Sequence, residues 1–369
     1  MPDVLVTGGA GFIGSHTVDG LVEQGYKVRV LDNLEPQVHT SKKITHINPG
    51  AEYINGDIRY RKHWIRALEG VEYIIHLAGA VGIAQSFWQV KKYVDVNASG
   101  TANLYQAIEE VPKIRSNLRK IVVASSKSCY GEGTYSCDEH GPFNPLQRPI
   151  QQLKNHQWEV LCPVCGRQSG PKAIREDKPL QNLNPYSLSK YVTEQLSMDY
   201  SYALGIETVA FRYFNVYGSR QSLSNPYTGV MAIFLSRLKN GNPPVIFEDG
   251  NQVRDYIHVS DVAAANRLAL ERGNGVYNLG TGIPTPLKEI ATRLAGLNGL
   301  DILPHITSDY RPGDNRHDFA DNTKLNRDLK VSNFMSLEKG LSELIHWSAD
   351  QVAVDKFALS ESQRKKYLT

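Results

Sequence analysis

The side chains with the clearest chemistry lie in two motifs, both well after the glycine-rich start of the chain. Tyr186 and Lys190 stand four residues apart, and Ser126 precedes both. Residues i and i+4 of a helix project from the same face, so the lysine ammonium would lie beside the phenol. A neighbouring positive charge lowers the pKa of a phenol from its usual value of about 10. The pattern predicts that Tyr186 acts as general base and acid on an alcohol, while Ser126 hydrogen-bonds the reacting oxygen.

A glycine-rich turn at the start of the chain predicts a dinucleotide site. Val4–Thr7 has the pattern of a buried strand, and Phe12–Glu23 that of a helix. Between and within these segments, Gly8 allows a tight turn, Gly11 lets backbone approach a pyrophosphate, and Gly14 lets helix and strand pack closely. The N–H groups at the helix N-terminus would then bind the phosphates.

The second predicted strand, residues 27–32, indicates which dinucleotide binds. It ends in Asp32, near the spacing of about 20 residues at which a carboxylate binds the adenosine ribose. No arginine follows to accept a 2′-phosphate, which favours NAD over NADP. A capping or surface role for Asp32 is the alternative. The other residues predicted to contact the cofactor are Phe12, Ile13, Asn33, Asp57, Ile58, Leu77, Ala78, Gly79, Asn97, Tyr186 and Lys190.

Strand-like and helical segments alternate along the chain. Further strands are predicted at 52–55, 73–77, 120–124 and 206–212. This alternation predicts an α/β fold with a doubly wound parallel sheet of Rossmann type, in which ligands bind at the carboxyl ends of the strands. We expect residues 1–217 to form the NAD-binding domain and residues 218–369 a smaller α/β substrate lobe. The polar segment 360–369 is predicted to be a solvated tail.

Composition restricts the class of protein. Of the 369 residues, 41% are hydrophobic and 21% are charged, as in a soluble globular enzyme, and the formal net charge is only +3. This charge disfavours a nucleic-acid partner. No apolar stretch reaches the roughly 18 residues of a membrane span. The chain enters its first strand without a leader, and its four cysteines are too few for a disulfide scaffold, so we expect a cytoplasmic protein.

A polar insertion at about 132–180 carries a potential metal site. Cys137 and His140 form a C-x-x-H pair, and Cys162 and Cys165 form a C-x-x-C pair. This spacing predicts a closed tetrahedral zinc site, which would stabilise a segment with little hydrophobic content. A redox pair and unligated cysteines are the alternatives. We expect the zinc to be structural and to shape a lid over the substrate pocket.

Together these motifs resemble the extended short-chain dehydrogenase/reductase family, in its nucleotide-sugar epimerase and dehydratase branch. Three further segments carry the resemblance: 212–218, 253–258 and 311–314. The resemblance implies that Asn215, Arg254 and Arg311 contact the diphosphate of a sugar donor, a role that suits guanidinium groups. Ser128 and Asp314 are expected in the same substrate site, and Asp314 is expected to orient Arg311 or cap a turn.

The residues after Ser126 indicate the reaction. The family's dehydratases carry an acid pair there, whereas this chain has Lys127 and Ser128. The resemblance therefore implies NAD-dependent epimerisation at C4 through a transient 4-keto sugar. The Cys/His insertion resembles the dTDP-L-rhamnose 4-epimerase subgroup. A UDP-glucose or UDP-N-acetylglucosamine 4-epimerase, a net oxidoreductase and a non-catalytic NAD sensor stay open. The family implies a homodimer through the helices predicted at 90–110 and 184–204.

Overall fold

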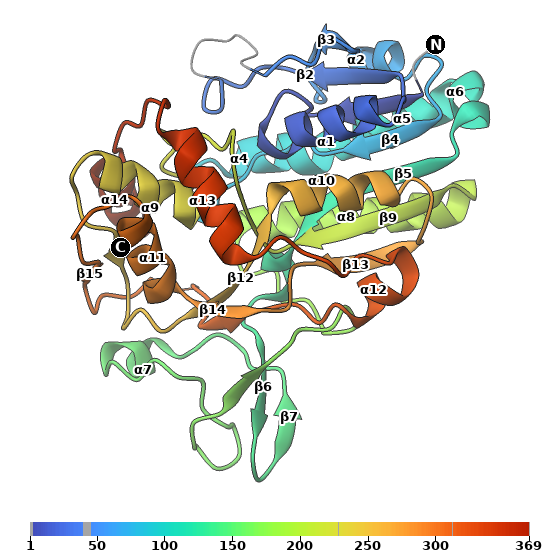
Figure 1. Cartoon of the computed structure of the whole chain (residues 1–369). Coiled ribbons are helices and arrows are strands. Elements are labelled where there is room, and N and C mark those ends of the chain that lie inside the picture. The colour runs from blue at the N-terminus through green and yellow to red at the C-terminus, as the bar shows by residue number, and fades with distance from the viewer. Residues whose placement is uncertain (1–2, 40–45, 228, 312, 369) are drawn as a thin grey trace.

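A seven-stranded sheet with helices on both faces forms the larger part of the molecule (Figure 1). The computed structural model describes residues 3–39, 46–227, 229–311 and 313–368. In sheet order the strands are β13 (Gly275–Leu279), β9 (Glu207–Tyr213), β5 (Lys120–Ser126), β4 (Tyr73–His76), β1 (Val4–Thr7), β2 (Val28–Asp32) and β3 (Ala51–Asn55). All neighbours are parallel, which confirms the doubly wound prediction. The strand order reverses at β1, where such sheets open a ligand crevice.

The strands are apolar on both faces because both faces are covered. In β1, Val4 and Val6 pack into one hydrophobic core, while Leu5 packs into the other. In β5, Val122 belongs to the first core and Ile121 to the second. Side chains of successive strand residues point to opposite faces, so the continuous apolar runs of the sequence supply both cores.

Each core is closed by its own set of helices. The first is covered by α1 (Phe12–Glu23), α10 (Val259–Leu268) and α12 (Thr323–Leu329). The second is covered by α2 (Arg61–Ala67), α5 (Gly100–Glu110), α6 (Pro112–Asn117) and α8 (Pro185–Leu204). The sequence defines both ends of α8: the Asn184 side chain accepts a hydrogen bond of 2.8 Å from the Ser187 backbone, and Gly205 ends the helix in a left-handed conformation.

The helix predicted over residues 90–110 differs from the prediction. It is divided into α4 (Val90–Tyr93), a π-helical turn η1 (Val94–Ser99) and α5. π-Helical turns often occur at functional sites. Here the turn carries Asn97 towards the loop after β4, where its side chain makes two hydrogen bonds to Ala80, and a third hydrogen bond goes to Ser189 on α8.

The smaller lobe packs around a third hydrophobic core. Its helices are α9 (Val230–Lys239), α11 (Leu287–Leu297) and α13 (Leu337–Ser348). Its short strands are β10 (Asn215–Tyr217), β11 (Val245–Ile246), β12 (Val253–His258), β14 (Pro284–Pro286), β15 (His305–Ile306) and β16 (His317–Asp318). Strand β13 of the large sheet and helix α10, which covers one face of that sheet, both come from residues beyond 217. The sheet and its covering helices therefore contain residues from both sides of the predicted domain boundary.

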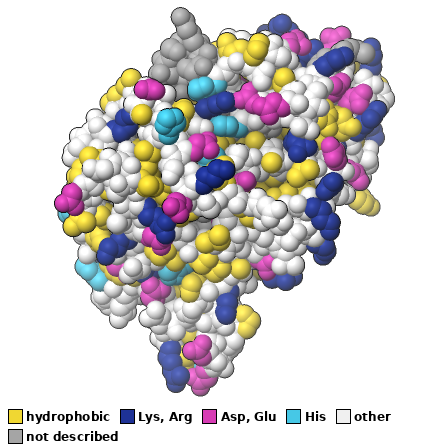
Figure 2. Space-filling model, viewed as in Figure 1, with side chains coloured by type: hydrophobic (Ala, Val, Ile, Leu, Met, Phe, Trp, Pro, Cys, Tyr) yellow, Lys and Arg dark blue, Asp and Glu magenta, His cyan; other side chains and the backbone are white. Residues whose placement is uncertain are grey.

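The insertion forms a small antiparallel sheet that projects from the body of the molecule (Figure 1). Its elements are β6 (Thr134–Cys137), β7 (Gly141–Phe143), α7 (Ile150–Lys154) and β8 (Gly170–Lys172). On the face of the molecule shown in Figure 2, acidic and basic side chains are interspersed, in keeping with the small net charge. Among the described residues, no helix combines the length and apolar character needed to cross a membrane.

The prediction of a solvated tail at 360–369 is wrong for the residues described there. Residues Phe357–Leu368 form helix α14, which packs against the smaller lobe. Its sequence is polar; Glu361 pairs with Arg311 of the smaller lobe, and the second ion pair, between Glu361 and Arg364, lies within the helix. Because its contacts are mainly charged and distant in sequence, apolar periodicity gives no sign of them.

Candidate active site

A cavity of about 810 Å³ at the carboxyl ends of the large sheet brings nearly all predicted site residues together. The predicted residues that line it are Gly8, Gly11, Phe12, Ile13, Gly14, Asp32, Asn33, Asp57, Ile58, Leu77, Ala78, Gly79, Ser126, Ser128, Tyr186, Lys190, Asn215, Arg254, Arg311 and Asp314. Asn97 does not line the cavity. Instead, its side-chain oxygen accepts a 2.8 Å hydrogen bond from the Ala80 backbone, and its amide donates to Ala80 and to Ser189. It therefore supports the loop after β4.

The glycine turn has the shape of a phosphate cradle. Gly8 has a φ of +68°, and a Cβ atom there would lie 2.8 Å from the Ala78 nitrogen. A Cβ atom on Gly14 would lie 2.0 Å from the Gly8 carbonyl oxygen. Among the described residues no side chain caps the N-terminus of α1 at Gly11, and its first turn holds no acid. The free N–H groups and positive helix end thus fit the pyrophosphate of NAD.

Asp32 is held at the end of β2 in a position to bind a ribose. Its carboxylate accepts hydrogen bonds from the backbones of Ala10, at 3.1 Å, and Leu34, at 2.9 Å. The sequence analysis missed His39, whose buried Nε2 lies 4.0 Å from an Asp32 oxygen. Nothing in the spacing of His39 from the glycine turn indicates this contact.

Ser126, Tyr186 and Lys190 meet at one wall of the cavity. Ser126 ends β5, and its oxygen accepts hydrogen bonds from the backbone of Ser128, at 3.2 Å, and from the Ser128 hydroxyl, at 2.9 Å. Tyr186 and Lys190 lie on α8 and are only 8% and 5% exposed. The Lys190 ammonium lies 3.6 Å from where a Cβ of Gly79 would stand, so it faces the loop after β4.

Burial, rather than the lysine charge, sets the pKa of the phenol in the protein. It raises the pKa of Tyr186 to about 12, with the Ser126 hydroxyl acting in the opposite direction. Burial also lowers the pKa of Lys190 to about 8, because the ammonium loses its hydration. The prediction that the pKa of Tyr186 falls below its usual value is therefore wrong when only groups of the protein act on the phenol. For Tyr186, removal of the phenol from water outweighs the hydrogen bond with Ser126.

A buried ion pair fixes the strand end that carries Ser126. The Arg212 guanidinium donates two hydrogen bonds to the Glu194 carboxylate, at 2.6 and 3.0 Å, and a third to the Tyr130 hydroxyl. Glu194 also accepts a 2.6 Å hydrogen bond from Ser125. Such bidentate pairs are strong and directional. They connect β5, α8 and β9 directly beneath the catalytic side chains.

Of the predicted substrate residues, Ser128 lies beside Ser126, whereas Asn215, Arg254 and Arg311 belong to the smaller lobe. Arg254 donates hydrogen bonds to the carbonyl groups of Asn315 and Arg316, so part of its guanidinium positions the loop that precedes β16. Asn215 donates to the Asp255 carbonyl at 3.1 Å. Arg311 stacks on Phe247, with 3.9 Å from its central carbon to the ring centre.

Lys127 occupies the position directly after Ser126. Its ammonium lies 2.6 Å from the Asp318 carboxylate, and Asp318 is also 3.5 Å from the Arg254 Nε. Among the described residues lining the cavity, the carboxylates are Asp32, Glu35, Asp57, Asp314 and Glu361. None of them comes from the strand end that carries Ser126.

Comparisons with known proteins agree with this geometry. Residues 5–149 match the family model described as GDP-mannose 4,6 dehydratase, and residues 162–280 match that of the NAD dependent epimerase/dehydratase family. A putative UDP-glucose 4-epimerase of Methanocaldococcus jannaschii is 37% identical, covering 78% of this chain and 79% of that protein. The dTDP-L-rhamnose 4-epimerase of Burkholderia thailandensis is 32% identical and covers 95% of both chains.

The structure of the Thermotoga maritima UDP-glucose 4-epimerase with UDP-glucose matches with a TM-score of 0.76 at 31% identity, covering 94% of this chain and 98% of that one. The chain belongs to the nucleotide-sugar epimerase branch of the extended short-chain dehydrogenase/reductase family. It is an enzyme. The Thermus thermophilus UDP-glucose 4-epimerase in complex with NAD matches with a TM-score of 0.75 at 29% identity, covering 95% of this chain and 100% of that one.

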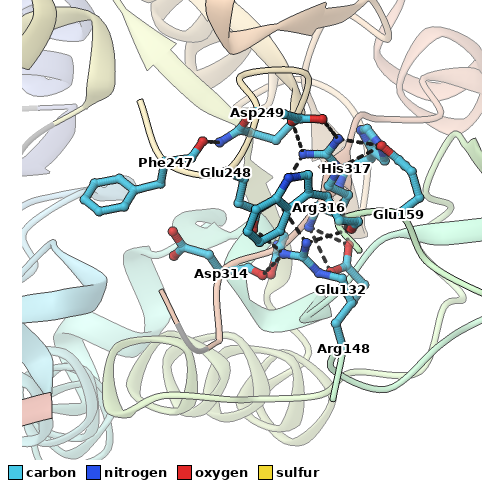
Figure 3. Close-up of polar contacts among 12 residues, drawn as sticks. Glu132, Arg148, Glu159, Phe247, Glu248, Asp249, Asp314, Arg316 and His317 are labelled. Atoms are coloured by element: carbon cyan, nitrogen blue, oxygen red, sulfur yellow. Dashed lines mark hydrogen bonds and ion pairs between the residues drawn. The ribbon is translucent and has the colours of Figure 1, made fainter. Parts of the chain in front are cut away.

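In this epimerase-family chain, the insertion is joined to the substrate lobe by buried charges (Figure 3). Arg148 donates to the Glu248 carboxylate at 2.7 Å and to the Asp314 carbonyl at 3.0 Å. The fully buried Arg316 pairs with Glu159, at 2.5 Å, and with Glu248, at 2.9 Å. The expected lid is wrong, since none of residues 132–180, all of which are described, lines the cavity. The insertion instead supports the loop that carries the cavity residue Asp314.

The four metal-ligand candidates of the insertion come together. Their ligand atoms all lie within 4.8 Å of one another. Cys137 Sγ is 3.6 Å from His140 Nδ1 and 3.7 Å from Cys165 Sγ, and Cys162 Sγ is 3.6 Å from the same nitrogen. For zinc bonds of about 2.3 Å to sulfur and about 2.0 Å to nitrogen, tetrahedral ligands stand about 3.5 to 3.8 Å apart. The cluster thus has the dimensions of a zinc site.

The glycine cradle gives a prediction for cofactor binding. Gly14→Ala places a methyl group against the Gly8 carbonyl oxygen, so we expect the NAD affinity measured by calorimetry to fall at least tenfold. Gly20→Ala is the matched control, because it lies on the same helix with nothing within 4 Å of its Cβ position. It should keep NAD affinity and raise the unfolding temperature, since alanine favours helix over glycine. Equal NAD affinity in both variants would contradict the assigned site.

Proposed function

We propose that this enzyme interconverts the C4 epimers of a nucleotide-diphosphate sugar, with NAD retained through the cycle and dTDP-L-rhamnose as the donor. The observation that carries the proposal is the shared cavity. The glycine turn, the catalytic candidates Ser126, Tyr186 and Lys190, and the guanidinium of Arg311 all line it. This arrangement supports a single cavity that binds NAD, the reacting sugar hydroxyl and the diphosphate of the donor.

In the proposed mechanism the phenolate form of Tyr186, which the positive charge of bound NAD would favour over the neutral phenol, receives the proton of the sugar 4-hydroxyl and later returns it. Ser126 hydrogen-bonds the same oxygen, which orients it towards the phenol. Lys190 supplies positive charge beside the loop after β4, where it would also bind the nicotinamide ribose. When bound, NAD supplies the site that accepts the C4 hydride and gives it back. Return of the hydride to the other face of the 4-keto sugar inverts C4 with no net redox change.

The pairing of Lys127 supports epimerisation over dehydration. Elimination of water needs an acid and a base at neighbouring sugar carbons. In this chain the residue after Ser126 is a cation neutralised by Asp318, and no cavity-lining carboxylate comes from that strand end. Oxidation at C4 and return of the hydride would need bound NAD as hydride acceptor together with Ser126, Tyr186 and Lys190, and no further acid.

The choice of donor rests on the Cys/His insertion, because chain coverage is equally high for relatives named after either donor. The dTDP-L-rhamnose 4-epimerase of Burkholderia thailandensis aligns over 95% of both chains, although proteins named UDP-glucose 4-epimerase are as similar. The decisive experiment incubates the purified enzyme separately with dTDP-L-rhamnose, UDP-glucose and UDP-N-acetylglucosamine and follows the sugar H-4 signals by NMR. Conversion of dTDP-L-rhamnose alone supports the proposal, and preferential conversion of a UDP-sugar replaces the donor while keeping the reaction.

We also propose that the insertion binds one structural zinc ion through Cys137, His140, Cys162 and Cys165. The backbone N–H of Glu139 and the ring and backbone of His140 lower the pKa of the Cys137 thiol to about 6, which favours the thiolate that binds metal. The metal would hold a segment whose own hydrophobic contacts are few. Catalysis at the sugar has no use for it, because none of the four ligands lines the cavity.

We further propose that the chain forms a homodimer through the region of α4, α5 and α8. Several apolar side chains are exposed there, as expected of a surface that a second subunit covers. They are Val90, Val94, Leu188 and Tyr202.

The mechanism predicts the effect of removing one oxygen atom. Tyr186→Phe should lower kcat by about a hundredfold or more, the usual contribution of a general base, while NAD affinity is unchanged. Tyr202→Phe is the matched control on the same helix, since that side chain is 94% exposed. It should leave kcat unaltered. Wild-type turnover by the Tyr186 variant would contradict the role of the phenol.

The metal proposal predicts a fixed stoichiometry. Mass spectrometry of the purified enzyme should find about one zinc per chain, and Cys162→Ser should lose it and unfold at a lower temperature. Cys129→Ser is the control, because this fourth cysteine lies outside the cluster, and it should keep the zinc. A metal-free wild-type protein with a Cys162–Cys165 disulfide would favour the redox alternative.

A further inference from the structure

The C-terminal helix α14 forms part of the cavity wall that faces the donor. Phe357, Ser360, Glu361 and Arg364 line the same cavity as Tyr186 and the glycine turn. None of these four residues belongs to a motif that the sequence analysis identified, and the reaction described above assigns them no role.

Glu361 lies between two arginines inside this wall. One carboxylate oxygen is 2.6 Å from the Arg311 guanidinium, and the other is 2.9 Å from that of Arg364. The three side chains are largely or partly shielded from water, with exposures of 15%, 32% and 13% for Glu361, Arg311 and Arg364. Both guanidinium groups also approach the Phe247 ring, at 3.9 and 5.6 Å from its centre.

Charge and hydrogen bonding both indicate an anion larger than one carboxylate. Two arginines and one glutamate leave one positive charge unbalanced, whereas a sugar-linked diphosphate carries two negative charges. In addition, the buried Nε of Arg311 has no hydrogen-bond partner among the described residues. Guanidinium groups bind phosphate oxygens in pairs, so a diphosphate could use donors that one carboxylate leaves unpaired.

We propose that Arg364 is a donor-binding residue. Until the donor binds, the Glu361 carboxylate occupies the place between Arg311 and Arg364 that the diphosphate takes, and the donor then displaces it. The proposal rests on the function given above, because it takes Arg311 as a diphosphate ligand. Displacement requires only rotation of the Glu361 side chain, which exchanges one anion for another on the same two cations.

Two further contacts keep α14 in the wall while Glu361 moves. Tyr367 stacks on Trp88, with ring centres 5.5 Å apart, and the Tyr227 hydroxyl hydrogen-bonds to Gln363. Trp88 and Tyr227 also contact each other edge to face at 5.9 Å. Arg364 is therefore held at the cavity by contacts that do not involve Glu361.

The test uses two substitutions with opposite expected effects. Calorimetry of the full-length enzyme with dTDP and UDP measures diphosphate binding without turnover, and initial rates give kcat and the donor KM. Arg364→Ala should weaken binding and raise KM about tenfold, because a hydrogen bond to a charged partner is lost. Glu361→Gln removes the competing charge and should strengthen binding and lower KM two- to fivefold, the scale of a partly exposed ion pair. In both variants kcat and NAD affinity should be unchanged.

The matched control is Glu289→Gln, which removes the same charge from an exposed pair with Arg293 on α11. Unaltered unfolding temperatures show that the variants fold. Weaker binding in both α14 variants would mean that the helix acts only through packing, and unchanged binding in Arg364→Ala would remove Arg364 from the site; either result overturns this inference alone. Wild-type enzyme that binds neither nucleotide would overturn the diphosphate site itself.

Discussion

A close approach of backbone to backbone in the cofactor site, between Gly8 of the glycine turn and Gly14 of helix α1, determines where the chemistry can occur. A Cβ atom on Gly14 would lie 2.0 Å from the Gly8 carbonyl oxygen, and one on Gly8 would lie 2.8 Å from the Ala78 nitrogen. Only glycine permits α1 to begin against β1 with its N–H groups directed into the crevice. The loop after β4, Ser126 on β5 and Lys190 on α8 are then positioned around that point.

Buried arginines connect the strand ends around the cavity to neighbouring segments of the fold. Arg212 binds Glu194 beneath the strand end of Ser126, and Arg316 joins the insertion to the loop of the donor site. A buried charge is stable only where its partner is fixed, so each arginine makes the position of several segments interdependent. The insertion thus helps to position Asp314 at the cavity through Arg148, although none of residues 132–180 lines the cavity.

The local parts of this arrangement could be predicted from the sequence, and the distant parts could not. The bounds of α1 and the residues around the glycine turn follow from apolar periodicity and glycine spacing, which act over a few residues. The strand β13 and the helix α14 were missed because β9, the neighbour of β13, and the charged Arg311, which pairs with Glu361 of α14, lie fifty or more residues away in the sequence. The direction of the Tyr186 pKa shift was missed because burial depends on the whole fold.

In the proposed reaction one cavity removes a hydride from C4 and returns it to the same carbon. Deuterium at C4 of dTDP-L-rhamnose can follow this hydride when the labelled donor is incubated with the enzyme as purified and without added NAD. We expect both 4-epimers to form, each to retain the deuterium, and no NADH to accumulate in solution. Loss of deuterium to the solvent, or release of NADH in proportion to the donor consumed, would contradict it.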